Sequence, residues 1–354
     1  DLEERLKNDT GNKDKFMDSL KAAGEDNSAK VVAAYLASKG FEAQYINPGE
    51  AGLLLSDEFG NARVLPESYG NLKNYCNKKG IMIFPGFFGY SKSGDVVTFP
   101  RGGSDITGSI LAAAVEAELY ENFTDVDSVF AANPKLVDNP RPIPVFTYRE
   151  MRELSYSGFS VLHEETLEPV YRNGIPVCIK NTNNPSAAGT LIVPKRELKN
   201  GPVVGIASGS GFCSIYVSKY MMNREIGFGR KLLSILEDEG LSYEHIPSGI
   251  DNMTIIIGEK QLCKSNVDHV INRIKNELEV DDISIEYDLA MVMIVGEGMM
   301  RTVGIAARAA NALSKEGINI QMINQGCSEV SMMFGIKSVD NVKAVKALYK
   351  EFFS

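Results

Sequence analysis

The sequence predicts an α/β protein: a layered domain with a mainly parallel sheet, followed by two small ferredoxin-like βαββαβ modules. Helical segments alternate with short apolar runs between residues 26 and 189, the pattern of a layered α/β domain. A charged linker, Lys195–Pro202, ends this pattern. Beyond it the sequence repeats at one constant spacing, which indicates a duplicated module. The matched pairs are Leu236 and Leu313, Glu239 and Glu316, Gly240 and Gly317, Ile246 and Ile323, and Gly249 and Gly326.

These patterns predict three domains: residues 1–194, 203–280 and 281–354, with strands that can interleave between the last two. Within the first domain, Asn27 and Ser28 are expected to cap a helix over Ala29–Lys39, which Gly40 ends. In the first module we expect strands over Val203–Ile206, Cys213–Val217 and Leu241–Ile246.

Composition narrows the class of protein. The 354 residues are 44% hydrophobic and 23% charged, as in soluble globular proteins. They contain neither an apolar run long enough for a membrane span nor an apolar signal core. The formal net charge of −9 argues against nucleic-acid binding but not against ATP. Five scattered cysteines and three scattered histidines predict a reduced, cytoplasmic protein that has no metal site of its own.

The most informative motif is a strand and two glycines that precede an alanine-rich helix. Residues 84–89 read FPGFFG, and residues 96–105 read VVTFPRGGSD. Glycines let a substrate approach the backbone, and the free N–H groups at a helix start attract anions. Arg101 adds a planar fork that suits a carboxylate or phosphate. The alternative reading is that Ser104 or Asp105 only caps the helix and that the glycines form a loop.

Five segments in order resemble elements of the amino acid kinase family, and of aspartate kinases in particular. The RGGSD segment resembles the substrate loop of that family. The others resemble its GE-x-x-SA element, its nucleotide element, a helix of the form YxEMxELSYxG and the close of its kinase domain. They are residues 24–29 (GEDNSA), 84–105, 123–135 (FTDVDSVFAANPK), 148–158 (YREMRELSYSG) and 179–185 (IKNTNNP).

The resemblance implies transfer of the ATP γ-phosphate to the β-carboxylate of L-aspartate, giving 4-phospho-L-aspartate. This is the first step of lysine, threonine and methionine biosynthesis. By match to the family, Glu25 would hold the substrate ammonium and Arg101 its α-carboxylate. Gly102, Gly103 and Ser104 would supply loop contacts, and Asp105 would organise the catalytic centre. Taken alone, Glu25 reads better as a solvated glutamate near a helix start, and the other motifs favour the substrate role.

The resemblance also places the nucleotide, with Mg²⁺ carried on ATP. Thr124 and Asp125 would line its site, with Phe130, Lys135 and Ser160 as further contacts. Three of these positions depart from the family pattern: Phe130 replaces a tyrosine, Lys135 an arginine and Ser160 a lysine. Ser160 alone could be an ordinary helix-entry serine. The glycine-rich opening strand of the family, which carries a phosphate-contacting lysine, is not in this sequence. We therefore expect the chain by itself to be catalytically impaired.

The duplicated modules resemble paired ACT domains, which bind amino acids at module interfaces. Lysine or threonine would bind the first module as a feedback effector, and the chain would form a homodimer or a higher oligomer. Residues 245–249 could instead form a plain turn with no part in effector binding. The second module would have a structural role and bind no effector. The expected effector-binding residues are Met222, Gly227, Ser248, Gly249, Ile250 and Asp251.

Two other functions remain open at this point. One is a related kinase of the same fold that phosphorylates glutamate, acetylglutamate, carbamate or a nucleotide. The paired modules and the GEDNSA segment argue against it. The other is a non-catalytic amino-acid sensor that retains the kinase fold, which the absent glycine-rich strand and Ser160 favour.

Overall fold

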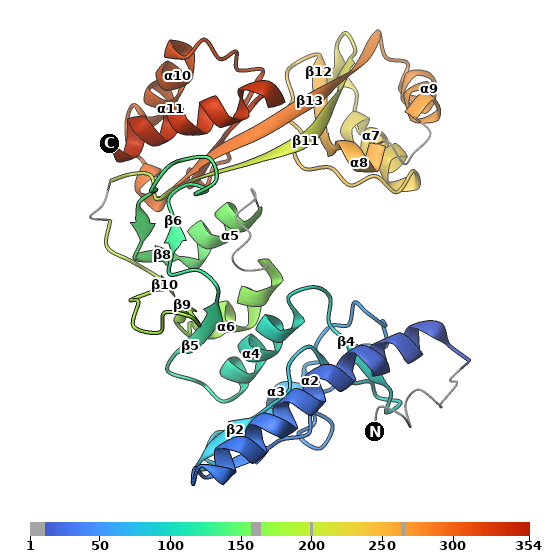
Figure 1. Ribbon diagram of the computed structural model, residues 1–354. Coiled ribbons are helices and arrows are strands. Elements are labelled where there is room, and N and C mark those ends of the chain that lie inside the picture. Colours follow the sequence, from blue (N-terminus) through green and yellow to red (C-terminus); the bar gives the residue numbers. More distant parts are fainter. Residues whose placement is uncertain (1–10, 157–163, 199–200, 263–266) are drawn as a thin grey trace. The chain divides into compact units, whose positions relative to one another are not determined.

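The protein was analysed as a computed structural model, which describes residues 11–156, 164–198, 201–262 and 267–354. The described residues form two compact units (Figure 1). The first contains residues up to 129 together with 142–155 and 164–197. The second contains residues 201–354 and also the separate segment 130–141. The predicted boundaries at residues 194, 203 and 280 remain predictions, but the predicted α/β class is confirmed by the helices and strands of both units.

The first unit begins with a long helix, α2 (Lys13–Ser38). Its N-cap is Asn12, whose Oδ1 accepts hydrogen bonds from the N–H groups of Asp14 and Lys15 at 3.0 and 3.2 Å. The prediction that the helix starts at Ala29, capped by Asn27 and Ser28, was therefore wrong. A single Gly24 costs only about 1 kcal/mol inside a helix, which the packing of α2 outweighs. The predicted end is right, because Gly40 has a positive φ of 86°.

The buried carboxylates of Asp18 and Asp26 join α2 to the rest of this unit by hydrogen bonds. Asp18 Oδ2 accepts hydrogen bonds from the backbone N–H groups of Gly60 and Thr98 at 2.7 and 2.8 Å. Asp26 accepts from the Tyr45 hydroxyl and from Lys30 Nζ. Hydrogen bonds to a carboxylate offset the cost of its burial, so these acidic residues are structural.

The helix α2 packs beside short strands and helices that form the outer part of this unit. Strands β1 and β2 pair in parallel, and β3 and β4 form an antiparallel hairpin. A buried apolar cluster between these elements includes Leu53, Leu55 and Ile110. The bounds are β1 (Ala43–Tyr45), α3 (Glu67–Leu72), η1 (Lys73–Tyr75), β2 (Ile81–Ile83), β3 (Phe88–Tyr90), β4 (Val96–Thr98) and α4 (Gly103–Ala114).

A four-stranded mixed sheet forms the other part of the first unit, in the order β5-β9-β10-β8. The β5–β9 and β8–β10 pairs are parallel, and the β9–β10 pair is antiparallel. Helix α4 packs against α6 and β5. The bounds are β5 (Tyr120–Thr124), β6 (Val129–Phe130), β7 (Pro142–Ile143), β8 (Val145–Thr147), α5 (Tyr148–Tyr156), η2 (Glu164–Leu167), α6 (Glu168–Asn173), β9 (Val177–Asn181) and β10 (Thr190–Val193).

A buried ion pair holds the chain where it leaves the first unit. Arg196 donates two hydrogen bonds to the carboxylate of Glu150, at 2.7 and 2.6 Å. The same carboxylate accepts from the Thr147 N–H, and Thr147 Oγ1 accepts from the Glu150 N–H, which is a capping box at the start of α5. One buried glutamate therefore connects the helix start to the residues after β10.

The second unit is built on one five-stranded antiparallel sheet in the order β12-β11-β13-β15-β14. The two longest strands, β11 (Gly205–Ser218) and β13 (Asp282–Val295), run through both halves of it (Figure 1). The prediction of two separate strands before residue 218 was thus wrong. The other bounds are η3 (Met222–Arg224), α7 (Phe228–Asp238), β12 (Asn252–Gly258), α8 (Glu259–Leu262), α9 (Val267–Leu278), η4 (Glu297–Met299), α10 (Ile305–Lys315), β14 (Met322–Asn324), β15 (Ser331–Lys337), η5 (Ser338–Asp340) and α11 (Asn341–Phe353).

A bulge divides the long strands between two hydrophobic cores. The register of β11 on β13 shifts between Ser210 and Ser214, and Gly211 has a φ of 89°. Before the bulge, the even-numbered Ile206 belongs to the core under α10 and α11. After it, the odd-numbered Ile215 and Val217 belong to the core under α7 and α9. Each strand contributes one extra residue here, first β11 and then β13, so the pairing register is restored while the buried parity of both strands changes. Each module can therefore bury its own apolar face.

The structure repeats as the sequence does. When Gly240 is aligned with Gly317, helices α7 and α10 begin and end at matching positions. Each helix has a glycine in the left-handed conformation as its N-cap, Gly227 in α7 and Gly304 in α10. The predicted strand Leu241–Ile246 was wrong: only isolated bridges at His245 and Ser248 join this stretch to β12. Pro247 has no N–H to donate and interrupts the ladder there.

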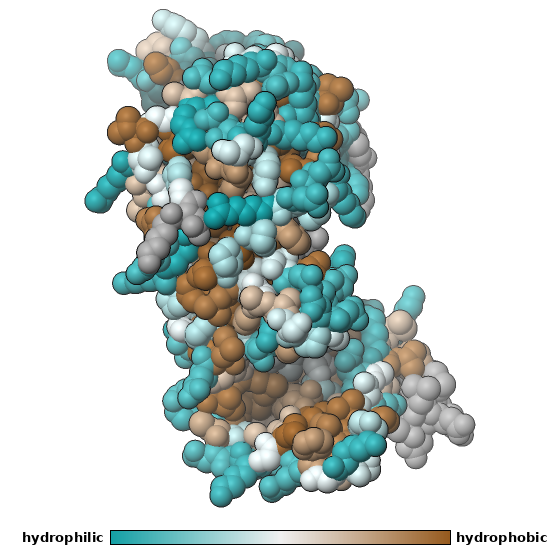
Figure 2. Space-filling view, turned by 60° about the vertical axis from the view of Figure 1, so that its left-hand side comes forward, coloured by the Kyte–Doolittle hydropathy of each residue, from teal (hydrophilic) through white to brown (hydrophobic). Residues whose placement is uncertain are grey.

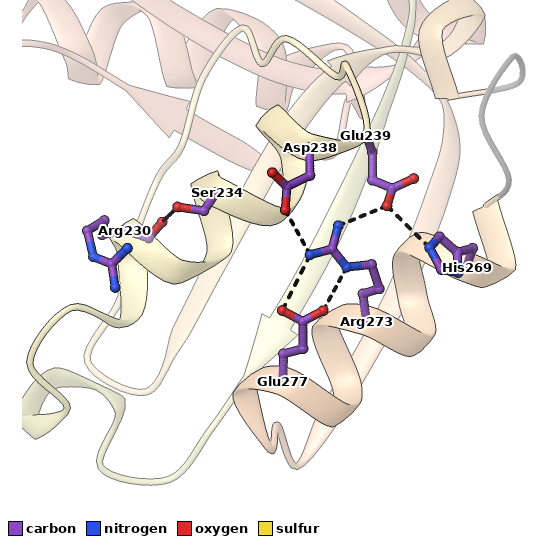
Figure 3. A network of polar contacts seen from close by, with 7 residues as sticks. All are labelled: Arg230, Ser234, Asp238, Glu239, His269, Arg273 and Glu277. Atoms are coloured by element: carbon purple, nitrogen blue, oxygen red, sulfur yellow. Dashed lines mark hydrogen bonds and ion pairs between the residues drawn. The ribbon is translucent and has the colours of Figure 1, made fainter.

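Charged side chains join two helices of the first module (Figure 3). The Arg273 guanidinium on α9 binds Asp238, Glu239 and Glu277, at 2.9, 2.9 and 2.6 Å. Hydrogen bonds to these carboxylates raise the pKa of Arg273. A network on one planar guanidinium fixes geometry better than isolated surface pairs do.

The turn at residues 85–87 packs directly on the start of α4. Phe87 has a positive φ of 76°, and its N–H donates to Thr107 Oγ1 at 3.0 Å. A Cβ on Gly103 would lie 2.7 Å from Phe87 Cδ2 and 2.8 Å from Phe99 Cβ, and one on Gly86 would lie 3.0 Å from the Ser104 Cα. Both glycines are therefore required by close approach.

We expect Gly103→Ala to destabilise the first unit by about 1–3 kcal/mol, the usual cost of overpacking a filled core. Differential scanning calorimetry would show this as a lower midpoint for that unit. Gly70→Ala is the matched control, because Gly70 lies in α3 with open space around it and is expected to be neutral or slightly stabilising. Equal midpoints for the two variants would contradict the proposed close packing.

Candidate functional site

The predicted substrate loop forms an uncapped helix start. Gly102 is the N-cap of α4, with a left-handed φ of 83°, and it has no side-chain capping bond. A glycine is needed here because other residues rarely adopt this conformation. The first N–H groups of α4 therefore remain available, and they carry the positive end of the helix dipole. Arg101 and Ser104 are exposed beside them.

Behind this helix start, Asp105 is held by residues that sequence reasoning missed. Asp105 is half-buried, and its Oδ1 accepts a hydrogen bond from Asn122 Nδ2 at 2.8 Å. Asn122 Nδ2 also donates to the Tyr120 hydroxyl at 3.0 Å, and that hydroxyl donates to the Asp105 carbonyl oxygen at 3.1 Å. Burial raises the pKa of Tyr120 to about 12. None of the sequence motifs pointed to Asn122 or Tyr120.

Glu25 lies on α2, within the helix and not near its start. It is exposed, and among the described residues no hydrogen bond or ion pair joins it to Arg101 or Asp105. The neighbouring Asp26 is the buried acid, bound to Tyr45 and Lys30. The substrate role of Glu25 remains a prediction.

Of the predicted nucleotide residues, Thr124 is the last residue of β5 and Asp125 follows it, at the carboxyl edge of the sheet. Thr124 Oγ1 donates to Asp125 Oδ1 at 3.2 Å. The parallel strand β9 ends beside them at Asn181, whose Nδ2 donates to Asp127 Oδ1 at 2.7 Å. Ligands in α/β sheets commonly bind outside the carboxyl ends of parallel strands, so the position suits a nucleotide.

The other predicted nucleotide residues belong to the second unit. Phe130 and Lys135 lie on segment 130–141, which packs into the core of the second module through Ala132 and Val137. The Ile206 N–H donates to the Ala131 carbonyl at 2.7 Å, and the Arg141 N–H donates to the Tyr349 hydroxyl at 2.8 Å. Sequence periodicity could not reveal this, because the segment is short and its partners lie far along the chain. Ser160 is outside the described residues.

The predicted effector residues gather at one end of the first module. Gly227 is the left-handed N-cap of α7, and Met222 is buried beside it in η3. Asp251 Oδ1 accepts a hydrogen bond from the Met221 N–H at 2.9 Å, so this carboxylate also stabilises the turn. Ser248, Gly249 and Ile250 are exposed.

Two hollows in the described structure lie away from these predicted residues. One, of about 800 Å³, borders α3, α4 and α6 and is lined by residues including Phe99, Ile106 and Ile110. The other, of about 410 Å³, lies at the start of α10 in the second module, beside Gly304 and Gly326. The second module thus has a hollow at the position where the effector was predicted in the first.

Neither a built metal site nor a membrane span is found in the described part of the chain. No group of three or more His, Cys, Asp or Glu side chains there could hold a metal ion. None of the helices that the structure describes is both long and apolar enough to cross a bilayer.

Comparison with known proteins bears directly on the predicted family. The sequence model of the amino acid kinase family matches residues 1–181, and that of an ACT domain matches residues 292–352. Aspartokinase 3 of Bacillus subtilis is 60% identical over 354 residues, which cover all of this chain and 78% of that protein.

Comparison with solved structures also identifies aspartate kinases as similar proteins. The aspartate kinase of Clostridium acetobutylicum is 43% identical, with a TM-score of 0.86 over 95% of this chain and 75% of that one. Aspartokinase III of E. coli, solved with aspartate and ADP, has a TM-score of 0.76 over 98% of this chain and 77% of that one. At 24% identity it shows the fold alone. The predicted resemblance is confirmed, and the chain belongs to the amino acid kinase family and, within it, to the aspartokinases.

Proposed function

We propose that the protein transfers the γ-phosphate of ATP to the β-carboxylate of L-aspartate, giving 4-phospho-L-aspartate. The observation that carries this proposal is the uncapped start of α4, with Arg101 exposed on one side and Asp105 held on the other. Phosphoryl transfer needs positioning and charge neutralisation more than covalent help from the protein. Such a helix start supplies both for a small dicarboxylic acid.

In this proposal each group has a distinct task. The α-carboxylate of aspartate binds the free N–H groups of α4 and the Arg101 guanidinium, which is suited to a two-bond contact. Glu25 binds the substrate ammonium. Thr124 and Asp125, at the end of β5, bind the nucleotide, with Phe130 and Lys135 as further contacts. Mg²⁺ fits this donor set, because it keeps several waters and needs one or two carboxylates besides the ATP phosphates.

A substrate test separates the candidate functions. The full-length protein is incubated with ATP, Mg²⁺ and hydroxylamine, which traps acyl phosphates, and with aspartate, glutamate or acetylglutamate as acceptor. Trapped product with aspartate alone is expected. Product with another acid instead would identify a related kinase, and no product with any acid would favour a non-catalytic sensor.

Arg101→Lys is expected to raise the KM for aspartate roughly 10- to 100-fold, because a charge-assisted contact of about 1.5–3 kcal/mol loses its fork. The KM for ATP should stay within about twofold. Initial-rate kinetics on the full-length protein measure both. Arg172→Lys is the matched control, since Arg172 pairs with Glu168 on the exposed face of α6. An unchanged KM for aspartate would remove Arg101 from the proposed site.

We also propose that lysine or threonine binds the first module as a feedback effector. The left-handed Gly227 at the start of α7 supports a carboxylate site, and Asp251 supports an ammonium site. The effect would reach the nucleotide residues through segment 130–141, which packs in the core of the adjoining module. This would control a cytoplasmic enzyme at the entry to lysine, threonine and methionine synthesis.

We also expect the protein to act as an oligomer. Hydrophobic residues gather in patches on the surface (Figure 2), and Ile226 and Ile250 near the proposed effector site are 98% and 70% exposed. Exposed apolar side chains of this kind support a partner surface, and we propose a homodimer or a higher homo-oligomer.

Lysine or threonine at saturating concentration is expected to raise the thermal midpoint of the protein, because a ligand that binds only the folded state stabilises it. Asp251→Ala should abolish the shift. Ser328→Ala, at the position of the second module that matches Asp251 in the sequence repeat, should leave it intact. A shift that survives in Asp251→Ala and disappears in Ser328→Ala would place the effector in the second module instead.

A further inference from the structure

We propose that Asn122 and Tyr120 on β5 are positioning residues, which hold the Asp105 carboxylate away from its own helix start so that the N–H groups of α4 stay free for the substrate. This inference rests on the proposed function. It adds two residues that none of the family motifs in the sequence pointed to. Its basis is the set of contacts between β5 and the first turn of α4.

The position of Asp105 creates the need for such a restraint. Asp105 is the third residue of α4, counted from the first residue after the N-cap Gly102. A carboxylate in the first turn is attracted to the positive end of the helix and can accept hydrogen bonds from its free N–H groups. A carboxylate bound in that way would compete with a substrate carboxylate for the same donors.

The Asn122 amide provides the restraint without neutralising the charge. One N–H of its Nδ2 group is directed to Asp105 Oδ1 at 2.8 Å, and the other to the Tyr120 hydroxyl at 3.0 Å. Both donors of the amide are therefore in use, which fixes its orientation. An arginine or lysine in this place would also hold Asp105 but would cancel its charge. Among the described residues, Asp105 Oδ2 has no hydrogen-bond partner.

Tyr120 on β5 contacts both Asn122 and the first turn of α4. Its hydroxyl accepts from Asn122 and donates to the Asp105 carbonyl oxygen at 3.1 Å, so it contacts the side-chain and main-chain partners together. Burial raises the pKa of Tyr120 to about 12, so the hydroxyl remains a donor at neutral pH. The ring fits only because residue 108 of α4 is glycine: a Cβ there would lie 2.7 Å from the Tyr120 hydroxyl oxygen.

The burial of Asn122 supports a positioning role for this residue. Asn122 is 6% exposed in the middle of β5, opposite Ile179 of β9. An apolar side chain would fill such a position without any need for hydrogen-bond partners. The Nδ2 group of Asn122 donates to Asp105 Oδ1 and to the Tyr120 hydroxyl, so removing the amide would free the Asp105 carboxylate.

The test uses the full-length protein and compares kinetics with stability. Asn122→Leu, of similar size, is expected to lower kcat roughly 10- to 100-fold while the KM for ATP stays within about twofold. Tyr120→Phe, a milder change, should lower kcat about 3- to 10-fold. Gly108→Ala should act in the same direction through displacement of the Tyr120 ring, although alanine favours the helix.

Tyr148→Phe is the matched control. Like Tyr120, Tyr148 has its pKa raised to about 12 by burial, and its hydroxyl donates to a backbone carbonyl, that of Ile175. It should lose a comparable amount of thermal stability while kcat stays unchanged. The contrast between the two tyrosine variants separates positioning from a general structural role.

Three results would overturn the inference. The first is a kcat for Tyr120→Phe and Asn122→Leu within twofold of the unmodified protein. The second is a loss of kcat in Tyr148→Phe as large as in Tyr120→Phe at equal loss of stability. The third is an unmodified full-length protein that forms no trapped product with aspartate, which would remove the proposed function together with the inference. The first two would leave the proposed function standing.

Discussion

The functional account depends on one physical constraint: the N–H groups at the start of α4 must stay free of protein acceptors. Gly102 reaches the left-handed conformation that opens this helix start, and no side chain caps it. Gly86 and Gly103 allow the turn at residues 85–87 to close tightly against the helix. Phe87 adopts a positive φ to make that turn, a strain that its hydrogen bond to Thr107 helps to offset.

The regulatory half of the chain is organised by continuity of strands. Because β11 and β13 run through both modules, the two modules share one sheet. The bulge at Gly211 lets each module bury the correct face of these strands. Segment 130–141, which carries two of the proposed nucleotide contacts, packs in the core of the second module.

Much of this could be predicted from the sequence, for definite reasons. The glycines at 86, 102 and 103 were informative because each meets a steric or conformational requirement that no other residue satisfies. The sequence repeat placed α7 and α10 correctly, since duplication preserves element boundaries. Local signals failed where tertiary contacts decide: α2 continues through Ser28, and Pro247 interrupts a run that reads as a strand.

The restraint on Asp105 could not be predicted, because it joins a strand residue to a helix residue 17 positions away through side chains alone. Asn122 follows another polar residue, Glu121, and nothing in the sequence distinguishes the buried one from the exposed one. The same holds for segment 130–141, because its Ala132 and Val137 pack against core residues beyond position 200. Motifs identify which residues act, whereas packing determines how they are held.

The most direct test of the central claim is a crystal structure of the full-length protein with L-aspartate and a non-hydrolysable ATP analogue. The account predicts that the α-carboxylate of aspartate accepts hydrogen bonds from the first N–H groups of α4 and from Arg101, with Asp105 still bound to Asn122. Aspartate bound elsewhere, or a protein side chain capping α4 in the complex, would contradict it.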